Sequence, residues 1–169
     1  MGLLKNYFLI VVIVTSGYIM STSSVLAKLA IGGSAGMDFP FAHADKTEPG
    51  VSAEGFYRLD PYEVRFRFAD IQMKTYSVVV AIKHFFSDDV VRPYIEGALG
   101  PVITNIKGRG LGYGAYPEAS LGVDIGINTH LSTGVVARYF GLVYFGNTNS
   151  GKFEANHGLS LLGNFIVWF

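Results

Sequence analysis

Apolar and polar side chains alternate along most of the chain beyond residue 28. After Pro117 the odd positions up to Asn128 carry five apolar side chains, whereas the even positions carry only small, polar or charged ones. A period of two residues is the pattern of a β-strand whose two faces meet different surroundings. The pattern recurs along the chain and predicts eight strands, over residues 29–39, 51–60, 64–68, 75–85, 94–106, 117–128, 131–145 and 158–169.

The connections between these predicted strands differ in length in a regular way. Those at residues 60–62 and 128–130 are tight, and the links at 69–74 and 86–92 fit the scheme less well. Three connections are longer and rich in glycine, asparagine and charge: Ala42–Gly50, Lys107–Gly114 and Gly146–Lys152. An even number of antiparallel strands with alternating short and long connections is the layout of a transmembrane barrel. The sequence therefore predicts an all-β, eight-stranded antiparallel up-and-down transmembrane β-barrel.

The first 27 residues have a different pattern and are not expected to belong to the barrel. Lys5 precedes the apolar run Tyr7–Val14, and a stretch of small and polar residues follows and ends at Ala27. This order is typical of a secretory signal peptide, here cleaved after Ala27. The alternative, an uncleaved anchor, would need about 20 apolar residues. We therefore expect a signal peptide at 1–27 and one barrel domain at 28–169.

Alternation alone does not decide which face of the barrel meets lipid. A soluble, secreted, lipocalin-like carrier would turn the apolar face inward. However, only 15% of the residues are charged, compared with roughly 25% in typical soluble domains. The polar face consists mainly of glycine, serine, alanine and threonine, which suits a narrow lumen better than a surface in water. The apolar face is therefore predicted to point outward, toward lipid.

The charged side chains on the predicted inner face are nearly balanced in sign. Buried ions are tolerated when they are paired and hydrogen bonded, so a mixed set suits a closed interior. We expect these side chains to form a lumen charge network that plugs and stiffens the barrel. The network consists of Glu54, Arg58, Arg65, Arg67, Lys83, Glu96, Glu118, Asp124 and Arg138.

Aromatic residues and strand lengths also agree with a lipid-facing exterior. Several predicted strands approach the ~9–11 residues with which a tilted strand crosses a bilayer. Most aromatic residues of the apolar face lie toward strand ends, where interfacial girdles form. They are Phe39, Tyr57, Phe66, Phe68, Tyr76, Tyr139, Phe165 and Phe169.

Three stretches of the chain carry a family resemblance. Arg92–Gly100 begins Arg-Pro-Tyr and ends Gly-Ala-Leu-Gly, with Glu96 and Leu99 departing from the small residues of the family's strand, and Leu121–Tyr139 is a hairpin that ends in Ala-Arg-Tyr. The chain finishes Phe-Ile-Val-Trp-Phe at residues 165–169. Together they resemble the small eight-stranded outer-membrane β-barrel proteins of Gram-negative bacteria, the OmpA/OmpX-type barrel domains. The resemblance implies a monomer in outer-membrane lipid, with Phe165, Val167 and Phe169 as the signal for the outer-membrane assembly machinery.

Candidate catalytic chemistry is scarce in the sequence. The chain has no cysteine, which excludes disulfides, thiolate metal sites and cysteine nucleophiles. Balanced charge without a basic run argues against nucleic-acid binding. The four histidines lie in different predicted elements and lack the spacing of a metal site: His43, His84, His130 and His157. We therefore expect no catalytic residue, cofactor or metal.

A lipid A-modifying barrel enzyme remains an alternative function. Residues 139–158 faintly resemble the outer-membrane lipid A deacylases, small barrels that use a His-x-Ser pair as base and nucleophile. Here Tyr144-Phe-Gly146 stands in that neighbourhood, without either group. A small pore, which is another alternative, would need an unfilled lumen. The favoured prediction is a structural or surface-interaction role, in envelope integrity, adhesion or partner binding through the long connections.

Overall fold

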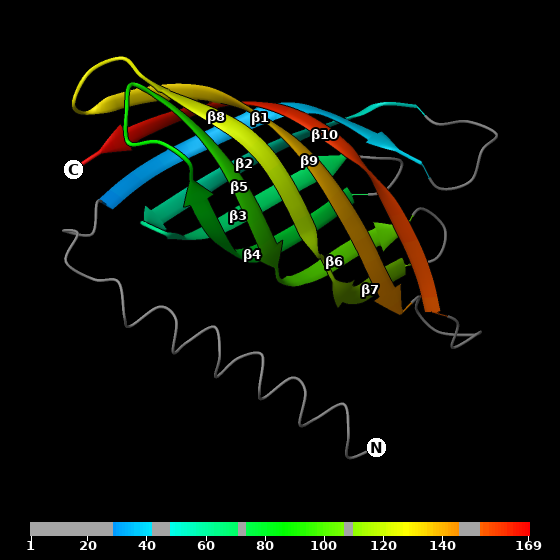
Figure 1. Ribbon diagram of the computed structural model, residues 1–169. Coiled ribbons are helices and arrows are strands. Elements are labelled where there is room, and N and C mark those ends of the chain that lie inside the picture. The colour runs from blue at the N-terminus through cyan, green and yellow to red at the C-terminus, as the bar shows by residue number, and fades with distance from the viewer. Residues whose placement is uncertain (1–28, 42–47, 71–73, 107–109, 146–152) are drawn as a thin grey trace.

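The computed structural model describes residues 29–41, 48–70, 74–106, 110–145 and 153–169. Every regular element in these ranges is a β-strand (Figure 1). The predicted signal peptide lies outside these residues. Within the same ranges, no helix has the length and apolar character needed to span a membrane. The strands are β1 (Leu29–Pro40), β2 (Gly50–Leu59), β3 (Tyr62–Asp70), β4 (Lys74–Phe85), β5 (Val91–Leu99), β6 (Pro101–Ile106), β7 (Gly110–Ala115), β8 (Glu118–Gly126), β9 (Leu131–Phe145) and β10 (Phe153–Trp168).

These ten segments build eight barrel strands, because two barrel strands are each interrupted once. β5 and β6 flank Gly100, and β7 and β8 flank Tyr116 and Pro117. The residues on the two sides of each break pair with the neighbouring strand at the same offset. Hydrogen bonds of 2.8 Å, from the backbone N of Tyr116 to the O of Gly100 and from the N of Gly141 to the O of Pro117, bridge the breaks. Each pair of segments therefore acts as one continuous strand.

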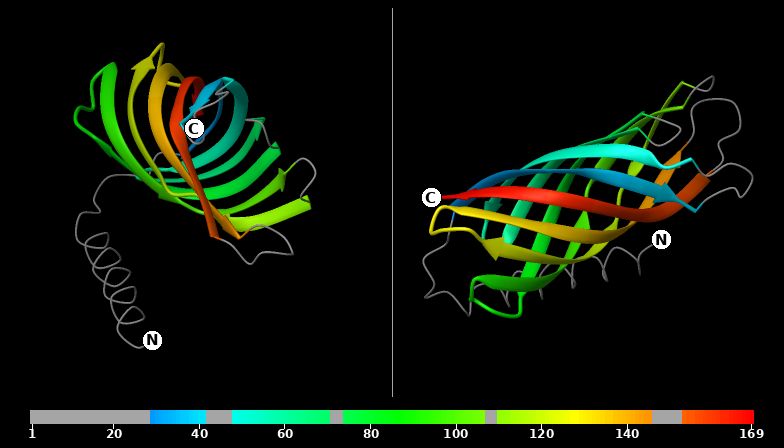
Figure 2. Two further views of the ribbon diagram at one scale, coloured as in Figure 1. Left: turned by 90° about the vertical axis from the view of Figure 1, so that its right-hand side faces the viewer. Right: turned by 90° about the horizontal axis from the view of Figure 1, so that it is seen from above.

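The barrel closes because β10 pairs antiparallel with β1 as well as with β9. Following paired residues once around the barrel leads from Leu29 to Phe39, ten positions further along β1, by way of Leu59, Tyr62, Ile82, Gly97, Ala119, Tyr139 and Leu159. With eight strands, a rise of ~3.3 Å per residue and a strand spacing of ~4.8 Å, this stagger gives a tilt of about 40°. Figure 2 shows the inclined strands. The predicted eight-stranded antiparallel up-and-down barrel is confirmed.

The alternation seen in the sequence is an alternation between the inside and the outside of this barrel. In β2 the residues from Gly50 to Arg58 are buried at every second position, and those between them are exposed. In β4 the exposed positions include Tyr76, Val80 and Ile82, at 43–54% exposure. The barrel therefore turns large apolar side chains outward and most polar ones inward, the reverse of a soluble barrel.

The two ends of the barrel differ. At one end, called the terminus end here, the chain turns at Asp60 and Pro61 and again between β8 and β9. The backbone N of Phe169 donates to the O of Leu29 at this end, at 2.9 Å. The strand ends that flank residues 42–47, 71–73, 107–109 and 146–152 lie at the opposite, loop end (Figure 1).

The prediction of a long connection at Lys107–Gly114 is wrong over most of its length. β7 begins at Gly110 and pairs antiparallel with β6, where Gly114 lies opposite Val102. Gly110 has a φ of 87°, a conformation that glycine adopts without strain as the chain enters the strand. The backbone groups of this glycine-rich run are thus paired in a sheet. Gly50, the predicted end of another long connection, is likewise the first residue of β2.

Candidate functional site

The lumen of the barrel holds the nine residues of the predicted charge network. Their exposed fractions range from 0% to 7%, and each has an oppositely charged partner within 4.0 Å. Two further buried carboxylates, those of Asp38 and Glu63, join the same network. Among the described residues, five buried cations therefore face six buried carboxylates inside the barrel.

Arg65 is the centre of this network. Its guanidinium donates to the carboxylates of Glu96 and Glu118 and lies 3.4 Å from Glu63 and 3.6 Å from Glu54. These carboxylates belong to β3 itself and to β2, β5 and β8. One side chain thus cross-links four barrel strands through the interior. Hydrogen bonds to charged groups are roughly twice as strong as neutral ones, so this contact set favours one fixed arrangement of the walls.

A second group of contacts lies toward the terminus end. Arg58 donates through Nε to Glu63 at 2.7 Å and through Nη1 to Asp124 at 2.9 Å. Nζ of Lys83 lies 3.2 Å from Glu63 and 3.2 Å from Glu96. Because Glu63 and Glu96 also contact Arg65, this group is continuous with the centre of the network.

A third group of contacts lies toward the loop end. Nη2 of Arg67 donates to Asp38 at 2.6 Å and to the hydroxyl of Ser160 at 3.0 Å. Arg138 donates to Glu54 and, at 3.2 Å, to the hydroxyl of Ser120. Glu54 also contacts Arg65, so the three groups of ion pairs form one continuous network.

Apolar side chains pack inside the barrel on both sides of the charges. Toward the terminus end a buried cluster comprises Ala30, Phe56, Ile166 and Trp168. Toward the loop end a larger cluster comprises Val79, Val102, Tyr116, Phe140, Leu142 and Tyr144. A third, between β5, β9 and β10, comprises Tyr94, Val136 and Leu162. The ion pairs are therefore shielded from both mouths, which strengthens their mutual attraction.

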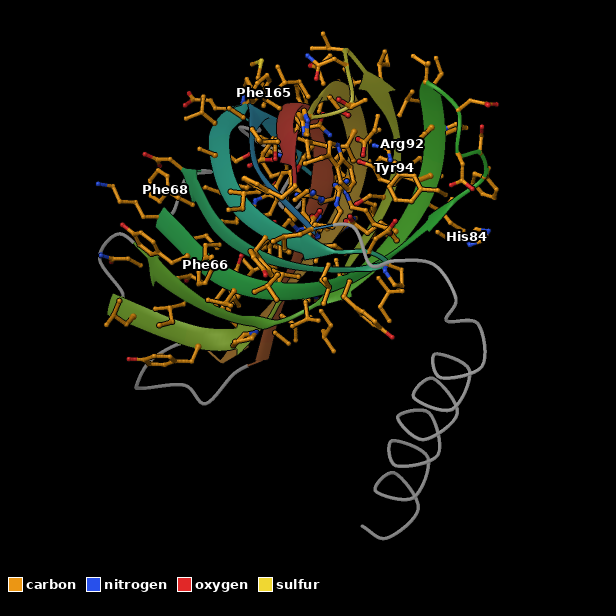
Figure 3. The ribbon with its side chains drawn as sticks, turned by 90° about the vertical axis from the view of Figure 1, so that its left-hand side faces the viewer. Phe66, Phe68, His84, Arg92, Tyr94 and Phe165 are labelled. Carbon is orange, nitrogen blue, oxygen red and sulfur yellow. The ribbon has the colours of Figure 1, made fainter. Side chains whose placement is uncertain are left out.

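Trp168 connects the terminus-end cluster to the charges. The guanidinium carbon of Arg58 lies 5.5 Å from the centre of its ring, and that of Arg92 lies 4.6 Å from it. Its indole Nε1 donates to the hydroxyl of Ser132 at 2.9 Å. A cation over an aromatic face is attracted to the ring, so Trp168 helps to hold the Arg58 side chain in place. Figure 3 shows Arg92 close to Tyr94 on β5.

Asp38 and Glu63 are the network members that the sequence analysis did not include. Glu63 lies two residues before Arg65 and therefore on the same face, but it falls outside the predicted strand 64–68. β3 begins at Tyr62, which places Glu63 inside the barrel. Asp38 lies on the polar face of the first predicted strand, so its even position in the alternating pattern is a sequence signal that it points into the lumen.

The outer surface carries the aromatic residues of the apolar face, including Phe66, Phe68 and Phe165 (Figure 3). The terminal residues Phe165 and Phe169 are exposed on this outer surface, at 50% and 70%. Val167, between them, is half-buried and pairs with Leu131 and Ile31. A role of these three residues in assembly remains a prediction.

The histidines lie apart. His84 and His157 are exposed on the outer surface, His130 lies in the turn after β8, and His43 lies outside the described residues. Nδ1 of His157 is 3.0 Å from the hydroxyl of Tyr139. Within the described residues, no group of three or more His, Asp or Glu side chains is arranged to hold a metal ion.

Comparison with known proteins gives similarity at the level of structure. No family model matches the sequence, and no curated protein matches it either. The crystal structure of Neisserial surface protein A (NspA) aligns with a TM-score of 0.62 at 15% identity, over 83% of this chain and 97% of that chain. The N-terminal β-barrel domain of OprF from Pseudomonas aeruginosa aligns with a TM-score of 0.53 at 12% identity, over 83% and 99%.

A third neighbour is the outer-membrane protein OprG from Pseudomonas aeruginosa. It aligns with a TM-score of 0.51 at 12% identity, over 85% of this chain and 96% of that chain. All three alignments span nearly the whole neighbouring chain, so the likeness covers the complete barrel. The chain therefore has the fold of the small eight-stranded outer-membrane β-barrels.

Proposed function

We propose that this chain is a monomeric outer-membrane β-barrel protein with a physical role, which resides in the membrane and presents a surface at its loop end. The observation that carries the proposal is the distribution of side chains. Large apolar residues such as Phe66 and Leu121 are 61% and 65% exposed outside, whereas Arg58 and Asp124 are fully buried inside. Such an exterior is stable in hydrocarbon and would be unfavourable in water.

The lumen supports a structural barrel rather than a pore. Ion pairs around Arg65 link four strands, and apolar clusters pack on both sides of them. A water-filled path for ions would require these contacts to separate. We therefore expect the network to plug and stiffen the barrel, and expect planar bilayers containing the protein to show no steady single-channel steps.

The loop end is the proposed interaction surface. The connections there include residues 42–47 and 146–152, parts of the predicted long connections, which lie outside the described residues. One structural neighbour is named a surface protein. By analogy of fold, the role here is envelope integrity, adhesion or partner binding. The C-terminal strand would serve the assembly machinery during insertion.

Fractionation combined with electrophoresis tests the proposal. The mature protein should sediment with outer membranes and require detergent for extraction. A closed barrel should migrate differently before and after boiling, because heat unfolds it only above a threshold temperature. Recovery of a folded, monodisperse species in buffer without detergent would contradict membrane residence and favour the soluble carrier. Steady conductance steps would contradict only the plugged lumen.

A further inference from the structure

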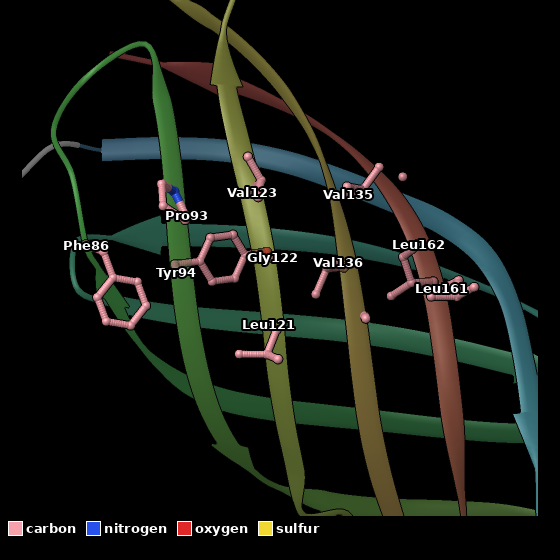
Figure 4. Close-up of a pocket in the computed structure, with 12 residues that line it drawn as sticks. Phe86, Pro93, Tyr94, Leu121, Gly122, Val123, Val135, Val136, Leu161 and Leu162 are labelled. Carbon is pink, nitrogen blue, oxygen red and sulfur yellow. The ribbon is translucent and has the colours of Figure 1, made fainter.

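A hollow with a charged lining lies at the terminus end of the barrel, and we call it the mouth hollow. Its volume is about 660 Å³, and Asp88, Asp89, Arg92 and His130 are among the residues that line it. It differs from the hollow in the outer wall across β5, β8, β9 and β10, whose lining is mainly apolar and suits hydrocarbon (Figure 4). A volume of this size is within the range of small-molecule sites. The charged lining favours a polar ligand.

The walls of the mouth hollow are fixed by hydrogen bonds within the chain. The turn after β4 and the turn after β8 form two of these walls. They are joined by a hydrogen bond of 2.7 Å from the backbone N of Gly126 to the O of Val90. In the second turn, Oδ1 of Asn128 accepts a hydrogen bond from the backbone N of His130 at 2.8 Å. A ligand therefore does not have to order these walls when it binds, which saves part of the entropic cost of binding.

Arg92 presents a cation to the mouth hollow. Its guanidinium carbon lies 4.6 Å from the centre of the Trp168 ring and 5.2 Å from that of the Phe85 ring. These rings hold the half-buried side chain in place, and Figure 3 shows it on β5 at this end. Within the described residues, the guanidinium forms no ion pair. Its N–H groups can therefore donate to both oxygens of a ligand carboxylate.

Two carboxylates face the same hollow without contacting this cation. Asp88 and Asp89 are exposed in the turn after β4. The hydroxyl of Ser87 donates to the carboxylate of Asp89 at 2.9 Å and accepts from the backbone N of Asp89 at 3.1 Å. These bonds hold the Asp89 side chain within its own turn instead of on Arg92. Both carboxylates are accessible to a ligand, and carboxylates form strong hydrogen bonds with ammonium groups.

His130 adds a neutral acceptor to the lining. Its Nδ1 lies 3.3 Å from the backbone O of Trp168. A carbonyl oxygen only accepts hydrogen bonds, so this contact assigns the proton to Nδ1. In the neutral ring, Nε2 is then an acceptor, which an ammonium group of a ligand can also use.

We propose that the mouth hollow binds a basic amino acid, which carries two ammonium groups and one carboxylate. The carboxylate pairs with Arg92, and the ammonium groups pair with Asp88 and Asp89. One cation and two carboxylates give the lining a net charge of −1, which a lysine-like molecule of opposite net charge neutralises. A diamine leaves Arg92 without a partner, and an acidic amino acid adds negative charge beside the two aspartates. The site goes beyond the proposed function, whose interaction surface lies at the opposite end of the barrel.

Three water-soluble probes test the proposal on the folded barrel in detergent. They are L-lysine, cadaverine, which lacks the carboxylate, and 6-aminohexanoate, which lacks the α-ammonium group. Saturation-transfer NMR detects binding, and the fluorescence of Trp168, the single tryptophan of the chain, measures the affinity. Lysine should bind in a saturable way. Each of the other probes should bind about tenfold more weakly, because each loses one charged hydrogen-bonded pair.

Variants of the lining separate the two halves of the site. Arg92→Gln should weaken lysine binding about tenfold without weakening cadaverine binding, because the diamine does not use the guanidinium. Asp88→Asn combined with Asp89→Asn should weaken the binding of both probes. Asp70→Asn is the matched control, since Asp70 is also exposed but lies at the loop end of β3, and this variant should bind lysine like the wild type.

The outcomes that would overturn the proposal are distinct from those that test the membrane barrel. Absence of saturable lysine binding, equal affinities of the wild type for lysine and cadaverine, or equal lysine binding by the wild type and a folded Arg92→Gln variant would each overturn it. Any of these results with a heat-modifiable, membrane-inserted barrel would leave the proposed function intact.

Discussion

Replacement of Arg65 by methionine removes the central cation of the lumen while keeping a long apolar side chain. Four carboxylates lie within 4 Å of the Arg65 guanidinium. After the change, four buried cations would face six buried carboxylates among the described residues, in place of five against six. The side chain is 2% exposed, so water cannot readily replace the lost partner.

The magnitude follows from the contacts that remain. Breaking a buried pair by removing one partner costs roughly 3–5 kcal/mol. Each carboxylate that loses its contact with Arg65 still has another cation nearby: Glu63 keeps Arg58 at 2.7 Å, and Glu96 keeps Lys83 at 3.2 Å. Glu118 keeps Arg67 at 3.3 Å. We therefore expect the lower end of the range, about 3 kcal/mol, or a fall of roughly 6–12 °C in the unfolding midpoint.

The assay is the temperature at which the folded band disappears in heat-modifiability gels, together with urea unfolding in detergent micelles. Arg65→Lys, which keeps the charge, should lose less than Arg65→Met. Adding Glu118→Gln to Arg65→Met should recover part of the loss, because the excess of buried carboxylates over buried cations falls from two to one. Equal midpoints for the wild type and Arg65→Met would refute the reasoning that these ion pairs stabilise the barrel.

Three further changes test other parts of the account. Arg138→Ala should remove a cation from Glu54 and Glu118 and lower the temperature at which the folded band disappears in heat-modifiability gels, whereas Lys74→Ala, at an exposed site, should leave that temperature unchanged. An unchanged temperature for Arg138→Ala would show that Arg138 does not stabilise the network. Gly122→Val should destabilise the barrel by about 1–3 kcal/mol in urea unfolding, because a Cβ atom at this position would lie 2.3 Å from the Tyr94 ring. If this variant were as stable as the wild type, the Tyr94 ring would have to move aside at no cost. Leu161→Arg, on the outer face in the middle of β10, should lower the free energy of folding into lipid vesicles by roughly 2–4 kcal/mol, and Val51→Arg, near the loop end, should lower it by less. A larger loss for Val51→Arg would contradict the placement of Leu161 deeper in the bilayer than Val51.

Much of the fold of this chain can be predicted from the local alternation of apolar and polar residues. Parity along each strand separates inward from outward side chains, so residues as distant in sequence as Glu54 and Arg138 can both be assigned to the inner face. Which inner residues touch is a different matter, since it depends on the stagger of the strands around the barrel. The contact between Arg58 and Asp124, 2.9 Å apart, joins β2 to β8 and has no local signal.

Regions with few side chains were harder to predict. The segment at Gly110–Gly114 offers mostly glycine, and its strand is stabilised by backbone pairing with β6 rather than by alternation. The breaks at Gly100 and at Pro117 leave the register unchanged, so no break in the pattern marks them.

The outer face of the barrel is expected to meet hydrocarbon. The chain contains no cysteine, so single cysteines at Val80, Val135 or Leu161 can each carry a spin label without background. In lipid vesicles these labels should collide frequently with dissolved oxygen and rarely with a water-soluble paramagnetic reagent, while a label at Asn128 in a turn should show the opposite. Free access of the water-soluble reagent to all three outer sites would contradict the account.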